Sequence, residues 1–339
     1  MNLPEKMKAI VIESYNPNLV RALYGLKMME ISVPPILKNQ VLIKLEAAPV
    51  NPSDIAFVRG GYNIRKTLPA VPGFEGAGRI VSTGNGVDEK LIGKMVCFFT
   101  QEENVGSWAG YVAVNVANTI TLKDEIPVEQ AACMFVNPFT AYALFEHVIE
   151  NGHDALILTG AGGQVGQFIR YFARERGVEV INIVRKDQHI AELQSQSEEY
   201  VLNVMDKDFA NQLSELALKL NATAAIDAVG GELTGKILNA MPEGSEVLLY
   251  GGLSGQPVSG IDPLEIIFKN KILGGFNLGI WLKDLSQEEL LTISEYLQSL
   301  VLERKIETKI QAGFPMTDFY NALRTYISNM SGGKVLLKM

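Results

Sequence analysis

Residues 155–184, ALILTGAGGQVGQFIRYFARERGVEVINIV, contain the pattern that decides the fold. An apolar run, ALILTG, leads into a glycine-rich turn, and a second apolar run, VEVINIV, closes the stretch. Between the two, Val165, Phe168 and Phe172 recur at intervals of three and four residues, which places them on one face of a helix. A strand, a helix and a second strand in this order form a βαβ unit, so the stretch predicts a parallel sheet.

The glycine-rich turn has the composition of a phosphate cradle. Because glycine has no Cβ atom, backbone N–H groups can approach a pyrophosphate, and the start of a helix adds partial positive charge. Gly166 would let the helix pack closely against the sheet. We therefore predict a dinucleotide site formed by Gly160, Ala161, Gly162, Gly163, Gln164, Val165 and Gly166. The alternative is an ordinary turn between a strand and a helix.

The residues after the second strand indicate which dinucleotide is bound. Sheets that bind NAD usually carry an acidic residue there, which bonds the ribose hydroxyls. Here Arg185 and Lys186 follow Val184, and a guanidinium suits a 2′-phosphate. The sequence therefore favours NADPH as the cofactor. The alternative is that Arg185 is a solvated turn residue and that Asp187 bonds the ribose of NAD.

The alternation of strands and helices continues along the chain. Apolar runs at 224–230 and 246–252 are separated by helical patterns, whereas the N-terminal third reads as short strands divided by turns. The C-terminal end holds one helix, a glycine turn and a closing strand. We expect an α/β protein in which 128–304 form a Rossmann domain with a doubly wound parallel sheet. A β-rich domain would comprise 1–127 and 305–339.

Composition excludes several classes of protein. The 339 residues include 38 acidic and 30 basic ones, a net charge of -8, so nothing indicates a basic face for nucleic acid. Two cysteines cannot form a disulfide framework. No stretch reaches the roughly 18 uninterrupted apolar residues of a membrane span, and the first residues contain no apolar signal-peptide core. We expect a cytoplasmic protein with no nucleic-acid partner and no membrane partner.

No set of metal ligands is evident in the sequence. A catalytic zinc needs three His, Cys or carboxylate ligands, and His147, His153 and His189 lie away from both cysteines and from an HExxH spacing. No GxSxG motif marks a serine nucleophile. We therefore predict a site without a metal.

Several stretches, in the same order, resemble the medium-chain dehydrogenase/reductase superfamily. They are AAPVNPSDIAFVRGGYNIRKTLPAVPGFEGAGRIVSTGNGV (47–87), VNPFTAY (136–142), GAGGQVG (160–166), YGGLSG (250–255) and GGK (332–334). Zinc-dependent members carry Cys where this chain has Asn51 and His where it has Phe74. The chain is therefore more similar to the zinc-independent branch of quinone oxidoreductases and enoyl-thioester reductases. The resemblance implies that the β-rich domain is a GroES-like catalytic domain.

Within that branch, the chain is more similar to the mitochondrial-type 2-enoyl thioester reductases, although its glycine turn resembles that of a quinone reductase. The resemblance implies that Tyr62 is the acid or oxyanion donor, since a phenol can donate a hydrogen bond and pass on a proton. It also implies that Asn51 lies beside the nicotinamide and the substrate. The alternatives are a surface aromatic residue in the turn RGGYN for Tyr62 and a turn-forming asparagine before proline for Asn51.

Other cofactor contacts implied by the same resemblance are a hydroxyl, two glycine-rich turns and a lysine. The turns would follow the nicotinamide half of the cofactor, and the lysine would reach its phosphate. The residues concerned are Thr140, Tyr250, Gly251, Gly252, Phe276 and Lys334. The alternatives are helix N-capping for Thr140, plain strand-end turns for the glycines, and a place in the core or in a substrate-pocket wall for Phe276 and Trp281.

We therefore predict a zinc-independent reductase that transfers hydride from NADPH to an activated C=C bond or a quinone. The substrate would be a small electrophile, namely an enoyl thioester, an enone or a quinone. The alternatives are a dedicated NADPH:quinone oxidoreductase and a non-catalytic NADPH-binding protein.

A late strand of the parallel sheet is predicted at KNKILGGFN (269–277). In the superfamily that the chain resembles, such a strand tends to lie at the sheet edge and to pair with its twin. This pairing covers an edge that would otherwise be exposed. We expect a homodimer.

Overall fold

The computed structural model describes residues 3–339, which form two compact units. Unit 1 runs to Val136 and resumes from Glu288 to Met339, and unit 2 is Asn137–Gln287. The sequence pattern indicated boundaries at 127/128 and 304/305. The β-rich unit is therefore larger at both junctions than the pattern suggests.

Side-chain hydrogen bonds join two helices near the boundaries to unit 1. The helix α3 (Val128–Ala131) is joined to the C-terminal segment because the Gln130 side chain donates to Thr308 O and accepts from Thr308 N, each at 2.9 Å. The helix α11 (Gln287–Leu302) is joined to unit 1 because the Gln298 side chain accepts from Lys123 N at 2.8 Å. Bonds of such long range leave no trace in a local hydrophobic pattern.

Unit 2 contains a parallel sheet of six strands. From one edge to the other, these are β10 (Tyr200–Asn203), β9 (Glu179–Val184), β8 (Ala155–Thr159), β11 (Ala224–Asp227), β12 (Glu246–Leu249) and β13 (Ile272–Gly275). The chain builds outward from β8 first in one direction and then in the other, so the strand order reverses between β8 and β11. This confirms the predicted doubly wound parallel sheet, whose ligands bind at the carboxyl ends of the strands near such a reversal.

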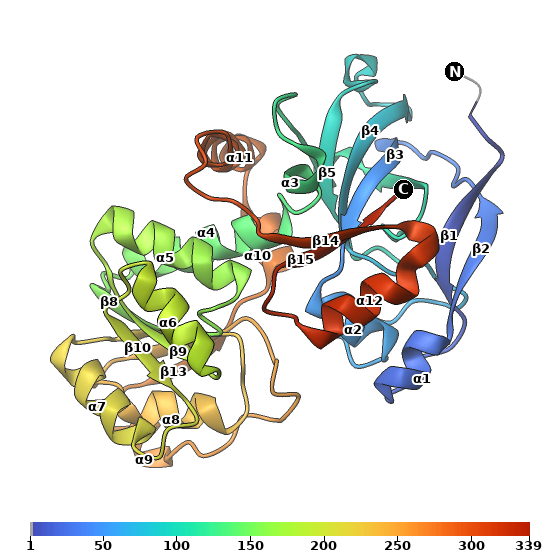
Figure 1. Cartoon of the computed structure of the whole chain (residues 1–339). Helices are drawn as coiled ribbons and strands as arrows, with labels where there is room; N and C mark the ends of the chain where they lie inside the picture. The colour runs from blue at the N-terminus through green and yellow to red at the C-terminus, as the bar shows by residue number, and fades with distance from the viewer. Residues whose placement is uncertain (1–2) are drawn as a thin grey trace. The chain divides into compact units, whose positions relative to one another are not determined.

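Helices connect successive strands of this sheet and lie along it (Figure 1). In α5 (Gln164–Arg176) the predicted apolar face is buried, including Phe168 and Phe172. The other helices are α4 (Val136–Glu150), α6 (Asp187–Ser195), α7 (Phe209–Lys219), α8 (Glu232–Ala240), α9 (Pro263–Lys269) and α10 (Leu278–Asp284).

Unit 1 contains two sheets and confirms the predicted β-rich domain. The strands β1 (Lys6–Ile12) and β2 (Leu26–Ser32) form an antiparallel pair. The larger sheet runs in the order β14 (Ile310–Pro315), β15 (Lys334–Lys338), β3 (Gln40–Pro49), β4 (Glu75–Thr83), β5 (Met95–Phe99) and β7 (Thr119–Thr121), and β6 (Tyr111–Asn115) pairs with β3. Because β15 pairs antiparallel with β3, the C-terminal segment returns to the first domain, as the sequence suggested.

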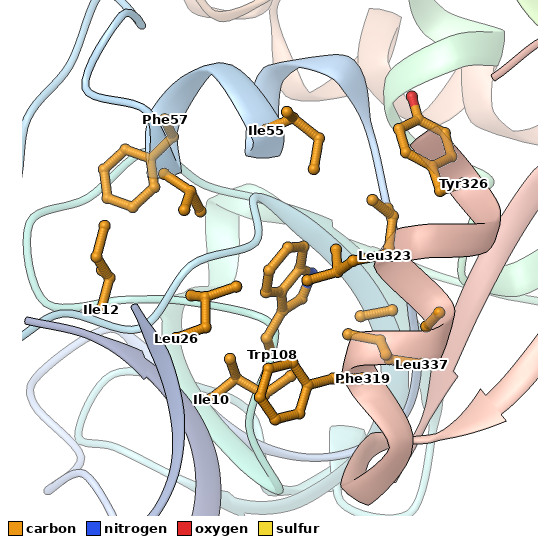
Figure 2. Close-up of a cluster of buried hydrophobic side chains, with 14 of the residues drawn as sticks. Ile10, Ile12, Leu26, Ile55, Phe57, Trp108, Phe319, Leu323, Tyr326 and Leu337 are labelled. Atoms are coloured by element: carbon orange, nitrogen blue, oxygen red, sulfur yellow. The ribbon is translucent and has the colours of Figure 1, made fainter. Parts of the chain in front are cut away.

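The core beside the larger sheet of unit 1 is built around Trp108, which is fully buried. Figure 2 shows Leu323 and Phe319 from α12 (Phe319–Ser328) beside this ring, and Phe57 from α2 (Pro52–Val58) belongs to the same cluster. Tyr62, in the loop after α2, packs against the same cluster. The core thus supports the loop that carries the predicted acid. The remaining short helices of unit 1 are α1 (Leu19–Tyr24), η1 (Glu89–Leu91), η2 (Val116–Asn118) and η3 (Met316–Asp318).

Candidate functional site

Asn51 lies at the junction between β3 and α2. Pro52 occupies the first position of the helix, where its fixed φ and its missing N–H are well tolerated. The Asn51 backbone N–H donates to Asp54 Oδ2 at 2.7 Å and so closes the first turn. Both residues are buried at this junction, with exposed fractions of 3% for Asn51 and 0% for Asp54.

The side-chain amide of Asn51 lies between two buried groups of opposite charge. Its Nδ2 donates to Glu75 Oε1 at 2.8 Å, and its Oδ1 accepts a hydrogen bond from Lys334 Nζ. The other carboxylate oxygen of Glu75 accepts from Val136 N at 2.9 Å. Since Glu75 begins β4 and Lys334 begins β15, two strands and the start of α2 meet here.

We call Asn51, Asp54, Glu75 and Lys334 the Asn51 cluster. Burial raises the pKa of Glu75, and the Lys334 ammonium opposes that rise. Burial also raises the pKa of Asp54, to about 7, and the nearby charge of Glu75 adds to the effect. Asp54 Oδ1 has no hydrogen-bond partner within residues 3–339. The cluster therefore contains a buried carboxyl group that changes its protonation state near neutral pH.

Tyr62 lies in the same unit, with its ring stacked on that of Phe74 at a centroid distance of 5.2 Å. The Gln101 side chain donates from Nε2 to the Tyr62 hydroxyl oxygen at 3.1 Å. Within residues 3–339 the Tyr62 hydroxyl has no acceptor for its own proton, which can therefore be donated to a ligand. Burial, followed by the charge of Asp54, raises the pKa of Tyr62, so the phenol keeps its proton at neutral pH.

The loop that carries Tyr62 is held in place by Tyr15. The Tyr15 hydroxyl accepts from Lys66 N at 2.7 Å and donates to Lys66 O at 3.0 Å. Gly60 has a φ of +72°, and a Cβ atom there would lie 2.8 Å from Tyr15 Cβ, so this position requires glycine. The Lys66 side chain is buried, donates to Val105 O, and has a pKa that burial lowers to about 8.

In unit 2 the predicted cradle is a tight turn between β8 and α5. Gly160 has a φ of +61°, and Gly163 is the N-cap of α5, so the helix begins at Gln164. A Cβ atom at Gly166 would lie 2.7 Å from Ala161 O. Gly166 therefore permits close packing of the helix against the turn, whereas the sequence suggested packing against the sheet. The backbone N–H groups at the start of α5 are those that a phosphate cradle uses.

Arg170 stabilises this turn from within α5, and the sequence analysis did not identify it. Its Nη1 donates to Ala161 O, and its Nε forms an ion pair with Glu198 Oε1 at 3.2 Å. The side chain is only 5% exposed. A basic residue four positions after the last glycine of the turn is the signal that could have suggested this contact.

Arg185 and Asp187 differ in how free they are to bind a ligand. Arg185 is exposed and follows the last residue of β9. Asp187 begins α6, and its Oδ1 accepts from Asn203 Nδ2 at 2.6 Å. The carboxylate is thus partly engaged within the protein.

The other predicted cofactor residues of unit 2 follow its central and edge strands. Tyr250 follows β12, its N–H donates to Asp227 O at 3.0 Å, and burial raises the pKa of its hydroxyl. Phe276 follows β13, and its N–H donates to Leu249 O at 2.7 Å. Gly251 and Gly252, after Tyr250, are exposed. Because the strands are parallel, these turns follow the carboxyl ends of the strands, as the glycine turn and Arg185 do.

Thr140 lies inside α4, four residues after its first residue, and is 7% exposed. It therefore does not cap the helix, which removes that alternative reading. Phe276 and Trp281 are in contact, with ring centroids 6.5 Å apart.

Residues 3–339 contain neither a cluster of metal ligands nor a membrane-spanning helix. No group of three or more His, Cys, Asp or Glu side chains there is arranged to hold a metal ion. Across the same residues, no helix has the length and apolar character needed to span a membrane.

Comparisons with known proteins match both units. Residues 37–124 match the family described as alcohol dehydrogenase GroES-like domain, and residues 165–293 match the family described as zinc-binding dehydrogenase. The mitochondrial enoyl-[acyl-carrier-protein] reductase of Arabidopsis thaliana is 31% identical, over 93% of this chain and 84% of its own length. The human enzyme of that name is 30% identical, over 96% of this chain and 90% of its own. A Mesorhizobium loti protein, described as an NADPH:quinone reductase and known from a crystal structure, has a TM-score of 0.93, 32% identity and 100% coverage of both chains.

Proposed function

The chain belongs to the branch of the medium-chain dehydrogenase/reductase superfamily that includes the enoyl reductases and the quinone reductases, and we propose that it is an NADPH-dependent reductase of 2-enoyl thioesters. The Arabidopsis and human relatives, named as enoyl-[acyl-carrier-protein] reductases, favour a thioester, and one observation supports a substrate with a carbonyl group. Gln101 donates to the Tyr62 oxygen at 3.1 Å, which leaves the phenolic proton available to an acceptor. A thioester carbonyl that gains negative charge during reduction is such an acceptor.

The proposed role of Tyr62 follows from where charge develops. When an electron pair reaches the β-carbon of an enoyl thioester, negative charge builds up on the carbonyl oxygen. A donor aimed at that oxygen is most effective in the transition state. Tyr62 would donate this hydrogen bond, and its raised pKa keeps the proton on the phenol until it is needed.

NADPH would be held by the glycine turn and by Arg185, and when bound it supplies the hydride. The residues present fit such a group. Gly163 caps α5, and the missing Cβ at Gly166 keeps the turn close to the helix start, so the N–H groups there can receive a pyrophosphate. Arg185 is exposed at the end of β9, where a guanidinium can bind a 2′-phosphate. Thr140, Tyr250, Gly251, Gly252 and Phe276 remain proposed contacts.

We propose that the reaction needs no zinc, because Asn51 and Phe74 stand where the zinc-dependent relatives carry ligands and Phe74 offers no donor atom. A non-catalytic NADPH-binding role is disfavoured by the free proton of Tyr62. The cytoplasmic location remains a prediction from the sequence, and the Arabidopsis and human relatives are named as mitochondrial.

Quinone reduction is the second candidate, and the Mesorhizobium loti protein supports it with a TM-score of 0.93. A substrate panel separates the two functions. Oxidation of NADPH is followed with crotonyl-CoA, a small enone and 1,4-benzoquinone. We expect the highest kcat/KM with crotonyl-CoA and the formation of butyryl-CoA. Turnover of benzoquinone without turnover of the thioester would refute the proposed substrate and favour the quinone reductase.

A further inference from the structure

Lys334 is buried in unit 1, although the sequence suggested that it reaches a cofactor phosphate. Its backbone N–H donates to Lys309 O at 2.7 Å, and its side chain is only 6% exposed. Its ammonium donates to Asn51 Oδ1, from a position 283 residues away in the sequence. Lysine is almost never buried to this extent without a partner. The charge of Lys334 is therefore engaged inside the Asn51 cluster.

The two charges on either side of Asn51 fix which way its amide points. The carbonyl oxygen faces the Lys334 ammonium, and the NH₂ group faces the Glu75 carboxylate, whose side chain is 1% exposed. A flip of the amide would place its oxygen against a carboxylate and its NH₂ group against an ammonium. Both contacts would be repulsive at low local dielectric. The amide therefore has one orientation.

This orientation leaves a single donor unused. An asparagine amide carries two N–H bonds, and Glu75 accepts one of them at 2.8 Å. Among residues 3–339, the Asn51 side chain makes hydrogen bonds with Glu75 and Lys334, which leaves its second N–H for a ligand. A donor of fixed direction beside a buried ion pair is suited to bind a carbonyl oxygen.

We infer that Lys334 and Glu75 are positioning residues that orient the Asn51 amide so that one N–H binds a carbonyl oxygen of the reactants, and that Lys334 does not bind a cofactor phosphate. The inference rests on the proposed function for the identity of the reactants. The orientation of Asn51 itself depends only on the contacts within unit 1.

A double-mutant cycle tests whether Lys334 acts through Asn51. The variants are Lys334→Met, Asn51→Ala and their combination, assayed with crotonyl-CoA at saturating NADPH. We expect Lys334→Met to lower kcat at least tenfold in the wild-type background and less than twofold when position 51 is alanine. Equal effects in both backgrounds would show that the lysine acts independently of Asn51, and the inference would be wrong.

Binding of NADPH gives a second readout that does not depend on turnover. We expect the NADPH Kd of Lys334→Met to stay within threefold of wild type. A rise of tenfold or more, with a weaker dependence of Kd on salt concentration, would show a phosphate contact and overturn the inference. The matched control is Lys338→Met, which removes an exposed lysine from the same strand that pairs with Glu129 at 2.9 Å.

A charge-balanced variant covers the case in which Lys334→Met is too unstable to assay, since it leaves Glu75 buried without a cation. We expect the unfolding temperature of Lys334→Met/Glu75→Gln to be closer to that of the wild type than the unfolding temperature of Lys334→Met is. We expect its kcat to remain at least tenfold below that of the wild type. Wild-type kcat in this double variant would overturn the inference.

If the wild-type chain reduces benzoquinone but no thioester, the proposed function fails. The double-mutant cycle of Lys334→Met and Asn51→Ala, measured by quinone turnover and by NADPH Kd, still decides the role of Lys334.

Discussion

Arg185 determines the expected choice between the two nicotinamide cofactors. Loss of a charge-assisted hydrogen bond costs roughly 1.5–3 kcal/mol, which corresponds to a factor of about 10 to 150 in Kd. We predict that the wild type binds NADPH more tightly than NADH and that Arg185→Ala weakens only NADPH binding by this factor. Fluorescence titration of both cofactors measures the effect, with NADH as the internal control. A wild-type preference for NADH, or equal weakening of both cofactors, would show that Arg185 does not bind the 2′-phosphate.

Asp54 makes the stability of unit 1 depend on pH. Its pKa is raised from 3.8 to about 7 in the folded state, so the folded chain keeps this proton at a pH where the unfolded chain has lost it. The stability that the protonated carboxyl provides is complete below pH 3.8 and is lost as the pH rises to about 7. Each pH unit in this window lowers the free energy of unfolding by up to about 1.36 kcal/mol.

The matched variant is Asp54→Asn, whose side-chain oxygen can still accept from Asn51 N. We predict that urea unfolding shows Asp54→Asn gaining stability relative to the wild type between about pH 4 and pH 7, and no further gain above pH 7. A difference between the two proteins that does not change with pH would contradict the raised pKa.

At the scale of elements, the loop after α2 is positioned by a tyrosine from outside the predicted site. Tyr15 makes two hydrogen bonds to the Lys66 backbone, and each such bond is worth about 0.5–1.5 kcal/mol. We predict that Tyr15→Phe lowers kcat on crotonyl-CoA roughly three- to tenfold and leaves NADPH Kd unchanged. The exposed Tyr24 provides the control, Tyr24→Phe.

The effect of Tyr15 should disappear when Tyr62 is removed. In a Tyr62→Phe background, Tyr15→Phe should change kcat less than twofold, because the loop then positions no hydroxyl. An undiminished effect in that background would mean that Tyr15 contributes only to stability.

The βαβ unit was predictable from sequence because its signals are local. The apolar spacing in residues 155–184 and the glycine turn lie within one stretch, and β8, α5 and β9 form there as expected. The Asn51–Lys334 contact was not predictable, since 283 positions separate the residues and only the pairing of β15 with β3 brings them together. Gln101 was also missed, because a glutamine shortly after a strand belongs to no recognised motif. The resemblance identified Tyr62 and Asn51, but not the partners that orient them.

At the scale of the whole molecule, the edge strand β13 predicts self-association. β13 lies at one edge of the parallel sheet, and Ile272 on it is 55% exposed. On the neighbouring helix α9, Phe268 is 73% exposed. An apolar edge strand left in water would promote aggregation unless it were covered. We propose that a second copy of the chain, paired edge to edge, covers it.

Light scattering at micromolar concentration should therefore give twice the chain mass of 37.1 kDa. Ile272→Lys should shift the population toward the single-chain mass, because a charge at the edge opposes pairing. A monomeric wild type, or a dimer unaffected by Ile272→Lys, would rule out this interface.

The central claim is that the free proton of Tyr62 serves the carbonyl oxygen of an enoyl thioester. The most direct test is kcat of Tyr62→Phe relative to wild type, measured on crotonyl-CoA and on 1,4-benzoquinone with NADPH Kd determined in parallel. General-acid assistance is worth roughly 10²–10⁴-fold, so we predict a loss of at least tenfold on the thioester, a smaller loss on the quinone and an unchanged Kd. Thioester reduction at the wild-type rate by Tyr62→Phe would contradict the claim and leave Tyr62 as a loop residue.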